Sequence, residues 1–135
     1  MTGKHVGQPQ WMDLTVDDAE TVRDFYAEVL GWTHQPVDMD GYQDFVMMAP
    51  DSAPSLSTTP PFVAAGICHA RGPNADLPPQ WLVYFGVDDL GRACQAATRL
   101  GGTLVSDIRT MGELRYAIIK DPAGAACGIM ENNAP

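Results

Sequence analysis

The stretch LTVDDAETVRDFYAEVLG, residues 14–31, decides the fold because it returns 71 positions later in altered form as YFGVDDLGRACQAATRLGG, residues 84–102. Each copy leaves an alternating strand through Val-Asp-Asp and then runs through about twelve helix-compatible residues to Leu-Gly. Two further pairs follow in the same order: GYQDFVMM (41–48) with GELRYAII (112–119), and AAGI (64–67) with ACGI (126–129). The repeat predicts a strand, a helix and two or three strands, twice over.

Capping residues predict where the helices begin and end. We expect Asp17 to cap the first helix, with Glu20 completing a capping box, and Gly31 to end it in a left-handed conformation. Apolar residues at spacings of three and four predict one packed stripe on each helix. The first stripe comprises Val22, Phe25, Tyr26, Val29 and Leu30, and the second comprises Leu90, Ala93, Ala97 and Leu100, before Gly101-Gly102.

Turn residues divide the rest of the chain. Asp121-Pro122-Ala123-Gly124 predicts a tight turn between two strands. Residues 69–79 form a connector rich in Pro and Gly, so we interpret residues 1–135 as one domain with repeats at 9–68 and 80–132. The polar loop at 49–61 is either a lid over a site or a flexible hairpin tip.

Charge and composition exclude several classes of function. The net charge of −9 opposes binding to nucleic acid or to an anionic membrane, and the acidic residues are scattered as on a solvated surface. No apolar run resembles a signal peptide or a membrane span. Cys68, Cys94 and Cys127 lack the spacing of a disulfide framework or a CxxC site, which predicts reduced thiols in a cytoplasmic protein.

Several of these motifs together resemble the vicinal oxygen chelate superfamily, which includes glyoxalase I, bleomycin-resistance proteins and extradiol dioxygenases. The likeness covers residues 9–132, and its matching pieces are Val16-Asp17-Asp18, Phe25-Tyr26, Leu30-Gly31-Trp32, Val87-Asp88-Asp89 and Asp121-Pro122-Ala123-Gly124. The resemblance implies an α+β fold of two βαβββ modules whose curved mixed sheets enclose a cavity.

The resemblance also implies where a metal would be bound. Metal-dependent members place a ligand five residues before the valine of Val-x-Asp and another shortly after Asp-Pro-x-Gly. Here these positions fall on Trp11 and Leu82, and on about Gly66 and Gly128, whose side chains cannot bind a metal. We therefore expect no metal and no other cofactor.

Strand alternation assigns the remaining side chains to faces. If Met12, Leu14 and Val16 pack on the helix, then Trp11, Asp13 and Thr15 face the cavity. By the same argument Leu82 and Tyr84, with Gly86, line the cavity from the second module, while Trp81 and Trp32 are packing residues. Such a wall suits a small amphipathic or cationic ligand, with Asp13 as a ligand-binding carboxylate or a general base.

The leading hypothesis is a metal-free member that binds a small organic molecule in the cavity between its modules, as a homodimer in which Ala93 and Ala97 allow close approach. A second hypothesis is a metal-dependent lyase, isomerase or dioxygenase with displaced ligands such as Asp13, His69 or Glu131. A metal-free isomerase or lyase using Asp13 as base lies between them. In a third, Trp11 fills the cavity and the domain is a dimeric interaction module.

Overall fold

The computed structural model describes residues 6–50 and 62–132, so His5 and most of the 49–61 loop lie outside it. The chain divides into two compact units, one running from Met12 to Trp81 and the other comprising the segments before and after it. Its elements are β1 (Pro9–Val16), α1 (Ala19–Leu30), β2 (Thr33–Asp38), β3 (Gln43–Ala49), β4 (Phe62–His69), a 3-10 turn (Gly72–Asn74), β5 (Trp81–Gly86), α2 (Leu90–Arg99), β6 (Thr103–Leu104), β7 (Arg109–Met111), β8 (Leu114–Lys120) and β9 (Ala126–Asn132).

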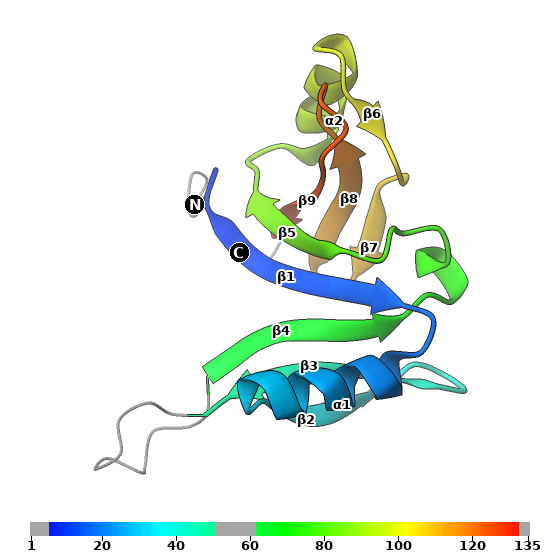
Figure 1. The fold of residues 1–135 in the computed structure, drawn as a ribbon. Helices are drawn as coiled ribbons and strands as arrows, with labels where there is room; N and C mark the ends of the chain where they lie inside the picture. The colour runs from blue at the N-terminus through cyan, green and yellow to red at the C-terminus, as the bar shows by residue number, and fades with distance from the viewer. Residues whose placement is uncertain (1–5, 51–61, 133–135) are drawn as a thin grey trace. The chain divides into compact units, whose positions relative to one another are not determined.

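The first unit has the strand order β2-β3-β4-β1 (Figure 1). β1 pairs in parallel with β4, whereas β2 with β3 and β3 with β4 pair antiparallel. The parallel pair sets Asp13 opposite Gly66 and Thr15 opposite Cys68. Helix α1 lies along β3 and β4, on one face of this sheet.

Helix α1 begins one residue later than the sequence predicts. Asp18, not Asp17, is the N-cap, and its carboxylate accepts hydrogen bonds from the backbone amide of Thr21 at 3.1 Å and from the Thr21 hydroxyl at 2.7 Å. Glu20 therefore forms no capping box, because it is the second residue of the helix. The predicted left-handed end at Gly31 is confirmed, with φ of 75°.

The core of the first unit lies between α1 and the sheet. Ala19, Phe45, Met47 and Ile67 are buried there, and Val16, Val22, Tyr26, Trp32 and Trp81 pack against them. The indole N–H of Trp81 donates to the Tyr26 hydroxyl at 3.1 Å, which confirms the prediction that Trp32 and Trp81 are packing residues.

The predicted apolar stripe of α1 is only partly correct. Val22 and Tyr26 pack on the core, but Phe25 and Val29 are 57% and 58% exposed, and Leu30 is exposed as well. Spacing fixes the angle of a side chain around the helix but not how far the sheet extends beneath it. The prediction was therefore wrong for these three residues.

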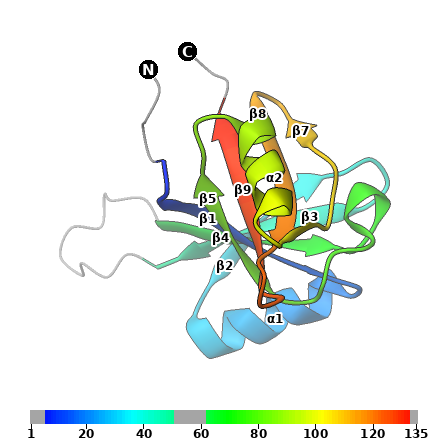
Figure 2. The same cartoon turned by 90° about the horizontal axis from the view of Figure 1, so that it is seen from above.

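The second unit has the strand order β5-β9-β8-β6, with β7 also paired to β8. Figure 2 labels β5, β9, β8 and β7 of this unit, and Figure 1 labels β6. β5 and β9 are parallel, and Tyr84 lies opposite Gly128. β8 and β9 are antiparallel and meet at the predicted Asp121–Gly124 turn, where the Asp121 carboxylate accepts from the backbone amides of Ala123 and Ala125. The α+β class and the βαβββ order predicted from the repeat are confirmed.

Helix α2 begins at the N-cap Asp89 and covers one face of the second sheet. Leu90, Cys94, Ala117 and Ile129 form the buried cluster beneath it, with Val87, Ala93 and Ile119 packed against them. Leu100 was assigned wrongly to the packed stripe, since it is 67% exposed in the helix C-cap. Ala93 is partly buried against this cluster, and the homodimer stays a prediction.

The described helices are also short. The longest, α1, has 12 residues, and no helix in residues 6–50 and 62–132 is long and apolar enough to cross a membrane. All three cysteines are free thiols.

Truncation of Leu14 tests the assignment of faces in β1. Leu14 is nearly fully buried, so Leu14→Ala should lower the free energy of unfolding by about 2–5 kcal/mol. Leu100→Ala, the matched change at an exposed leucine, should alter it by about 0.5 kcal/mol or less. Denaturant melts measure both, and equal losses would show that the first strand is placed wrongly.

Substitution of Asp17 and of Asp18 tests which of the two residues caps α1. The bonds from Thr21 hold the pKa of the exposed Asp18 carboxyl below its usual 3.8. A carboxyl with a lowered folded-state pKa stabilises the fold above its unfolded pKa and loses that contribution as the pH falls. Asp18→Ala should therefore lower the melting temperature at pH 7 more than Asp17→Ala does. The gap between the variants should narrow below pH 3.8, and a larger effect of Asp17→Ala would contradict the observed cap.

Candidate functional site

Each sheet carries its helix on one face, so the other face is the candidate site. In the first sheet Val16, Phe45 and Ile67 pack toward α1. Side chains of a strand alternate, so their neighbours Thr15, Asp44 and Cys68 lie on the opposite, helix-free face, together with Asp13. Asp44 was not singled out from the sequence, although its place before Phe45 in GYQDFVMM gives it this face.

The predicted site residues differ in exposure. Thr15 is 2% exposed, Leu82 and Tyr84 are buried, and Trp11 and Asp13 are half-buried. Trp11 and Asp13 are two residues apart on β1, and Leu82 and Tyr84 hold the corresponding positions on β5. The structure thus places each predicted residue on the helix-free side of its own sheet.

Burial shapes the chemistry of Cys68, which lies opposite Thr15. Burial raises the pKa of the Cys68 thiol far above its usual value, and the carboxylates of Asp13 and Asp44 raise it further. The thiol also bonds to Asp44, which favours its protonated form. Cys68 is therefore a neutral group on an acidic face and is not an activated nucleophile.

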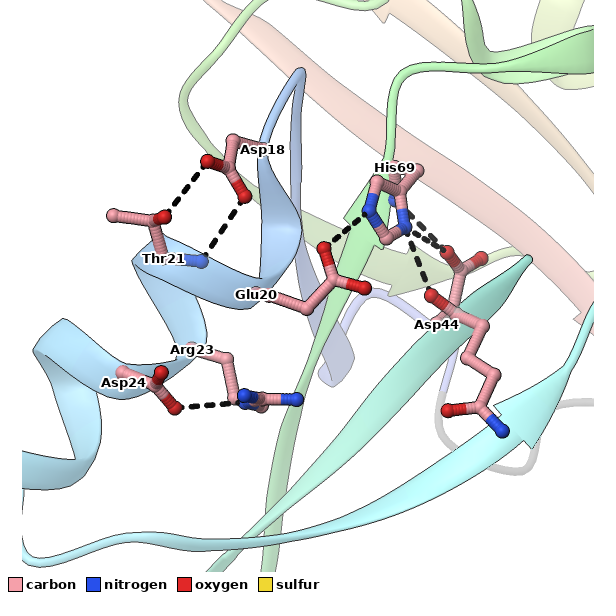
Figure 3. Close-up of polar contacts among 8 residues, drawn as sticks. Asp18, Glu20, Thr21, Arg23, Asp24, Asp44 and His69 are labelled. Atoms are coloured by element: carbon pink, nitrogen blue, oxygen red, sulfur yellow. Dashed lines mark hydrogen bonds and ion pairs between the residues drawn. The ribbon is translucent and has the colours of Figure 1, made fainter.

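A cluster of polar side chains lies at the end of β4, around His69 (Figure 3). The His69 ring lies between acceptors, with Nδ1 2.8 Å from the Gln43 carbonyl oxygen and Nε2 3.1 Å from Oε1 of Glu20. Asp44 accepts from the His69 backbone amide at 2.8 Å and lies 3.5 Å from Nδ1. Each nitrogen of the ring therefore faces an oxygen acceptor, one on β3 and one on α1.

Glu131 stands at the corresponding place in the second unit, three residues past Gly128 as His69 is past Gly66. Its Oε1 accepts from the backbone amide of Leu90 at 2.6 Å, at the start of α2, and its Oε2 accepts from Arg115 at 3.1 Å. His69 and Glu131 thus both tie the last strand of a unit to its helix. Both groups are occupied, so neither supports the hypothesis of displaced metal ligands.

The second helix-free face is aromatic. The Tyr84 ring packs over the backbone of Gly128, where an added Cβ would collide with the ring. Tyr116 meets Tyr84 edge to face, with ring centroids 6.0 Å apart. Tyr116 was not singled out from the sequence, where the repeat aligns it with Phe45, whose side chain faces the helix.

The residues present do not fit the metal that the resemblance implies. Trp11, Leu82, Gly66 and Gly128 offer no ligand atoms, and the Tyr84 ring fills the space in which a side chain at position 128 would project. Within residues 6–50 and 62–132, no three His, Cys, Asp or Glu side chains are grouped to hold a metal ion.

Comparisons with known proteins agree with this architecture. Two relatives are each 29% identical to this chain: CFP32 of Mycobacterium tuberculosis, described as a glyoxylase, over 129 residues, and the anthracycline biosynthesis protein DnrV of Streptomyces peucetius, over 133. The alignments cover 94% and 96% of this chain but 46% and 48% of the relatives, so the chain spans about half their length.

Solved structures show the same fold at low sequence identity. A methylmalonyl-CoA epimerase from Mycobacterium tuberculosis is 19% identical, with a TM-score of 0.56 over all of this chain and 94% of its own. A superfamily member from Vibrio splendidus 12B01 is 12% identical, with a TM-score of 0.56 over 90% of this chain and 97% of its own. The model of the Glyoxalase/Bleomycin resistance protein/Dioxygenase superfamily matches residues 5–128. With that match and with two βαβββ modules, the chain belongs to this superfamily.

Proposed function

We propose that this chain binds a small organic molecule on the helix-free side of its sheets, without a metal ion. The observation that carries the proposal is that the positions expected to bind a metal are occupied by residues without ligand atoms: Trp11, Leu82, Gly66 and Gly128. The Tyr84 ring lies over Gly128, while Asp13 and Thr15 keep polar atoms on the first sheet. Each sheet taken by itself therefore carries groups, aromatic on one and polar on the other, of the kinds that sites for small organic molecules use.

The relatives support the same class of ligand. DnrV is named for the biosynthesis of anthracyclines, which are small organic molecules, and it aligns with 96% of this chain. The acidity of the chain supports the choice as well, because a net charge of −9 opposes binding to a nucleic acid.

A set of three probes with one aromatic ring tests the proposal: 2-phenylethylamine, 2-phenylethanol and 3-phenylpropanoate. We expect at least one of them to bind saturably by calorimetry and to raise the melting temperature. Trp11→Ala should weaken that binding about fivefold, since an aromatic contact is worth roughly 1 kcal/mol. Phe25→Ala removes an exposed ring from α1 and should leave the affinity unchanged. Absence of binding by all three probes at millimolar concentration would contradict the proposal.

Removal and addition of metal test the second part of the proposal, that the chain binds its ligand without a metal ion. Dialysis against a chelator should change neither the melting temperature nor the probe affinity. Stoichiometric zinc, nickel or iron should leave the melting temperature within error, whereas a ligand at 100 times its dissociation constant would add about 2.7 kcal/mol to stability. Metal analysis of the purified protein should find well below one equivalent. A rise of several degrees with one equivalent of metal would show that a site exists.

A further inference from the structure

Helix α1 carries apolar side chains on a side that does not contact the core. Phe25 and Val29 are four residues apart, so they are neighbours on the helix surface, and both are more than half exposed. Among the Phe, Tyr and Trp side chains that the structure describes, Phe25 is the only exposed one. Single exposed apolar residues are ordinary on protein surfaces, whereas adjoining ones mark interaction surfaces. The pair on α1 is of the second kind.

The ring of Phe25 is supported from behind by a cluster of aromatic side chains. It meets the Tyr26 ring edge to face, with centroids 5.0 Å apart. The Tyr26 ring in turn packs against Trp32 and Trp81, with centroids 5.8 Å and 5.4 Å apart, and these three residues pack on the core. A side chain that is held in place before binding loses little freedom on binding, and aromatic residues are enriched at the centres of protein interfaces. Phe25 therefore has the properties of an interface anchor.

A row of carboxylates runs beside these apolar residues. Asp24 and Glu28 are also four residues apart on α1, each one position before an apolar residue, and both are exposed. The basic residue of the helix, Arg23, donates to Asp24 at 2.9 Å, as Figure 3 shows. Its guanidinium lies over the ring of Phe45 in the sheet, and its side chain is only 18% exposed. The exposed residues of α1 therefore combine apolar and acidic groups without a basic one.

The charge of the whole first unit has the same sign. Between Met12 and Trp81 the chain has eleven acidic and two basic residues, whereas the segments before and after have six of each. The net charge of −9 thus belongs entirely to the unit that carries α1. Such a unit attracts a basic partner and repels a second copy of itself, because two copies joined through α1 would bring two acidic units together.

We propose that Phe25, Val29, Asp24 and Glu28 form a docking surface for a basic protein segment, an amphipathic helix with lysines or arginines beside an apolar row. Apolar side chains of that helix pack on Phe25 and Val29, and its cationic groups pair with the two carboxylates. This surface lies on α1, away from the helix-free face of the first sheet. The inference therefore goes beyond the proposed function and does not depend on it.

Two synthetic helical peptides test the docking surface. One consists of leucine and lysine with the leucines on one face, and the other has glutamate in place of each lysine. The lysine peptide should bind saturably by calorimetry and shift the backbone amide resonances of α1. The glutamate peptide should bind about tenfold more weakly or less, because its charge matches that of the surface.

Paired substitutions locate the binding. Phe25→Ala should weaken binding of the lysine peptide about tenfold, whereas Leu100→Ala, which truncates an exposed leucine on α2, should leave it unchanged. Asp24→Asn combined with Glu28→Gln should weaken it severalfold at low ionic strength and reduce its salt dependence. Asp88→Asn, at an exposed carboxylate of the other unit, is the matched control and should do neither. All four residues are exposed or at a helix end, so the peptide-free melting temperatures should change little.

The outcomes separate this surface from its alternatives. No binding of the lysine peptide at millimolar concentration, or undiminished binding by Phe25→Ala, would overturn the proposal. Equal affinity for the two peptides would overturn the choice of a basic partner. A dimer in light scattering that Phe25→Ala converts to a monomer would show that a second copy covers the surface instead. Each of these results leaves binding of the ring probes, and with it the proposed function, unaffected.

Discussion

The parallel pairing of the first and last strands in each unit is the constraint on which the rest of the structure depends. β1 pairs with β4 and β5 with β9, and a parallel pair needs a long crossover between its strands. In both units that crossover begins with a helix, which packs on one face of the sheet. The core forms on that face, so the unit's own helix leaves the opposite face uncovered. Side chains that do not serve the core are therefore gathered on a single side.

The sequence predicts this arrangement well because the signals are local and occur twice. Val-Asp-Asp before each helix, Gly31 after the first and the turn at Asp121–Gly124 need no distant partner to be recognised. The features that the sequence predicts poorly are those that depend on residues far away in the chain. Two adjacent aspartates can each cap α1, and the choice of Asp18 depends on where the strand before it ends. The exposure of Phe25 and Val29 depends on the extent of the sheet beneath the helix.

The candidate site shows the same division. Alternation along a strand assigns Asp13, Thr15 and Tyr84 to the helix-free side from the sequence alone. The repeat alignment fails on the third strand of each unit, because an offset of 71 places Phe45 on Tyr116. In the structure Phe45 lies opposite Ile67 and Ala117 lies opposite Ile129, so the corresponding residues are one position further apart. A slip of one residue turns every side chain to the other face, so the repeat alignment would place the ring of Tyr116 on the helix side of its sheet.

The ends of β4 and β9 explain why polar residues near the expected metal positions do not form a metal site. His69 and Glu131 lie three residues beyond Gly66 and Gly128, and an odd separation turns their side chains toward the helices. A carboxylate suits that place, because the start of a helix carries partial positive charge, and Glu131 accepts the first amide of α2 directly. His69 carries no carboxylate, and its ring instead contacts the carboxylate of Glu20 on α1. Both side chains therefore hold a helix to its sheet. The polar groups that could bind a ligand are those on the helix-free faces.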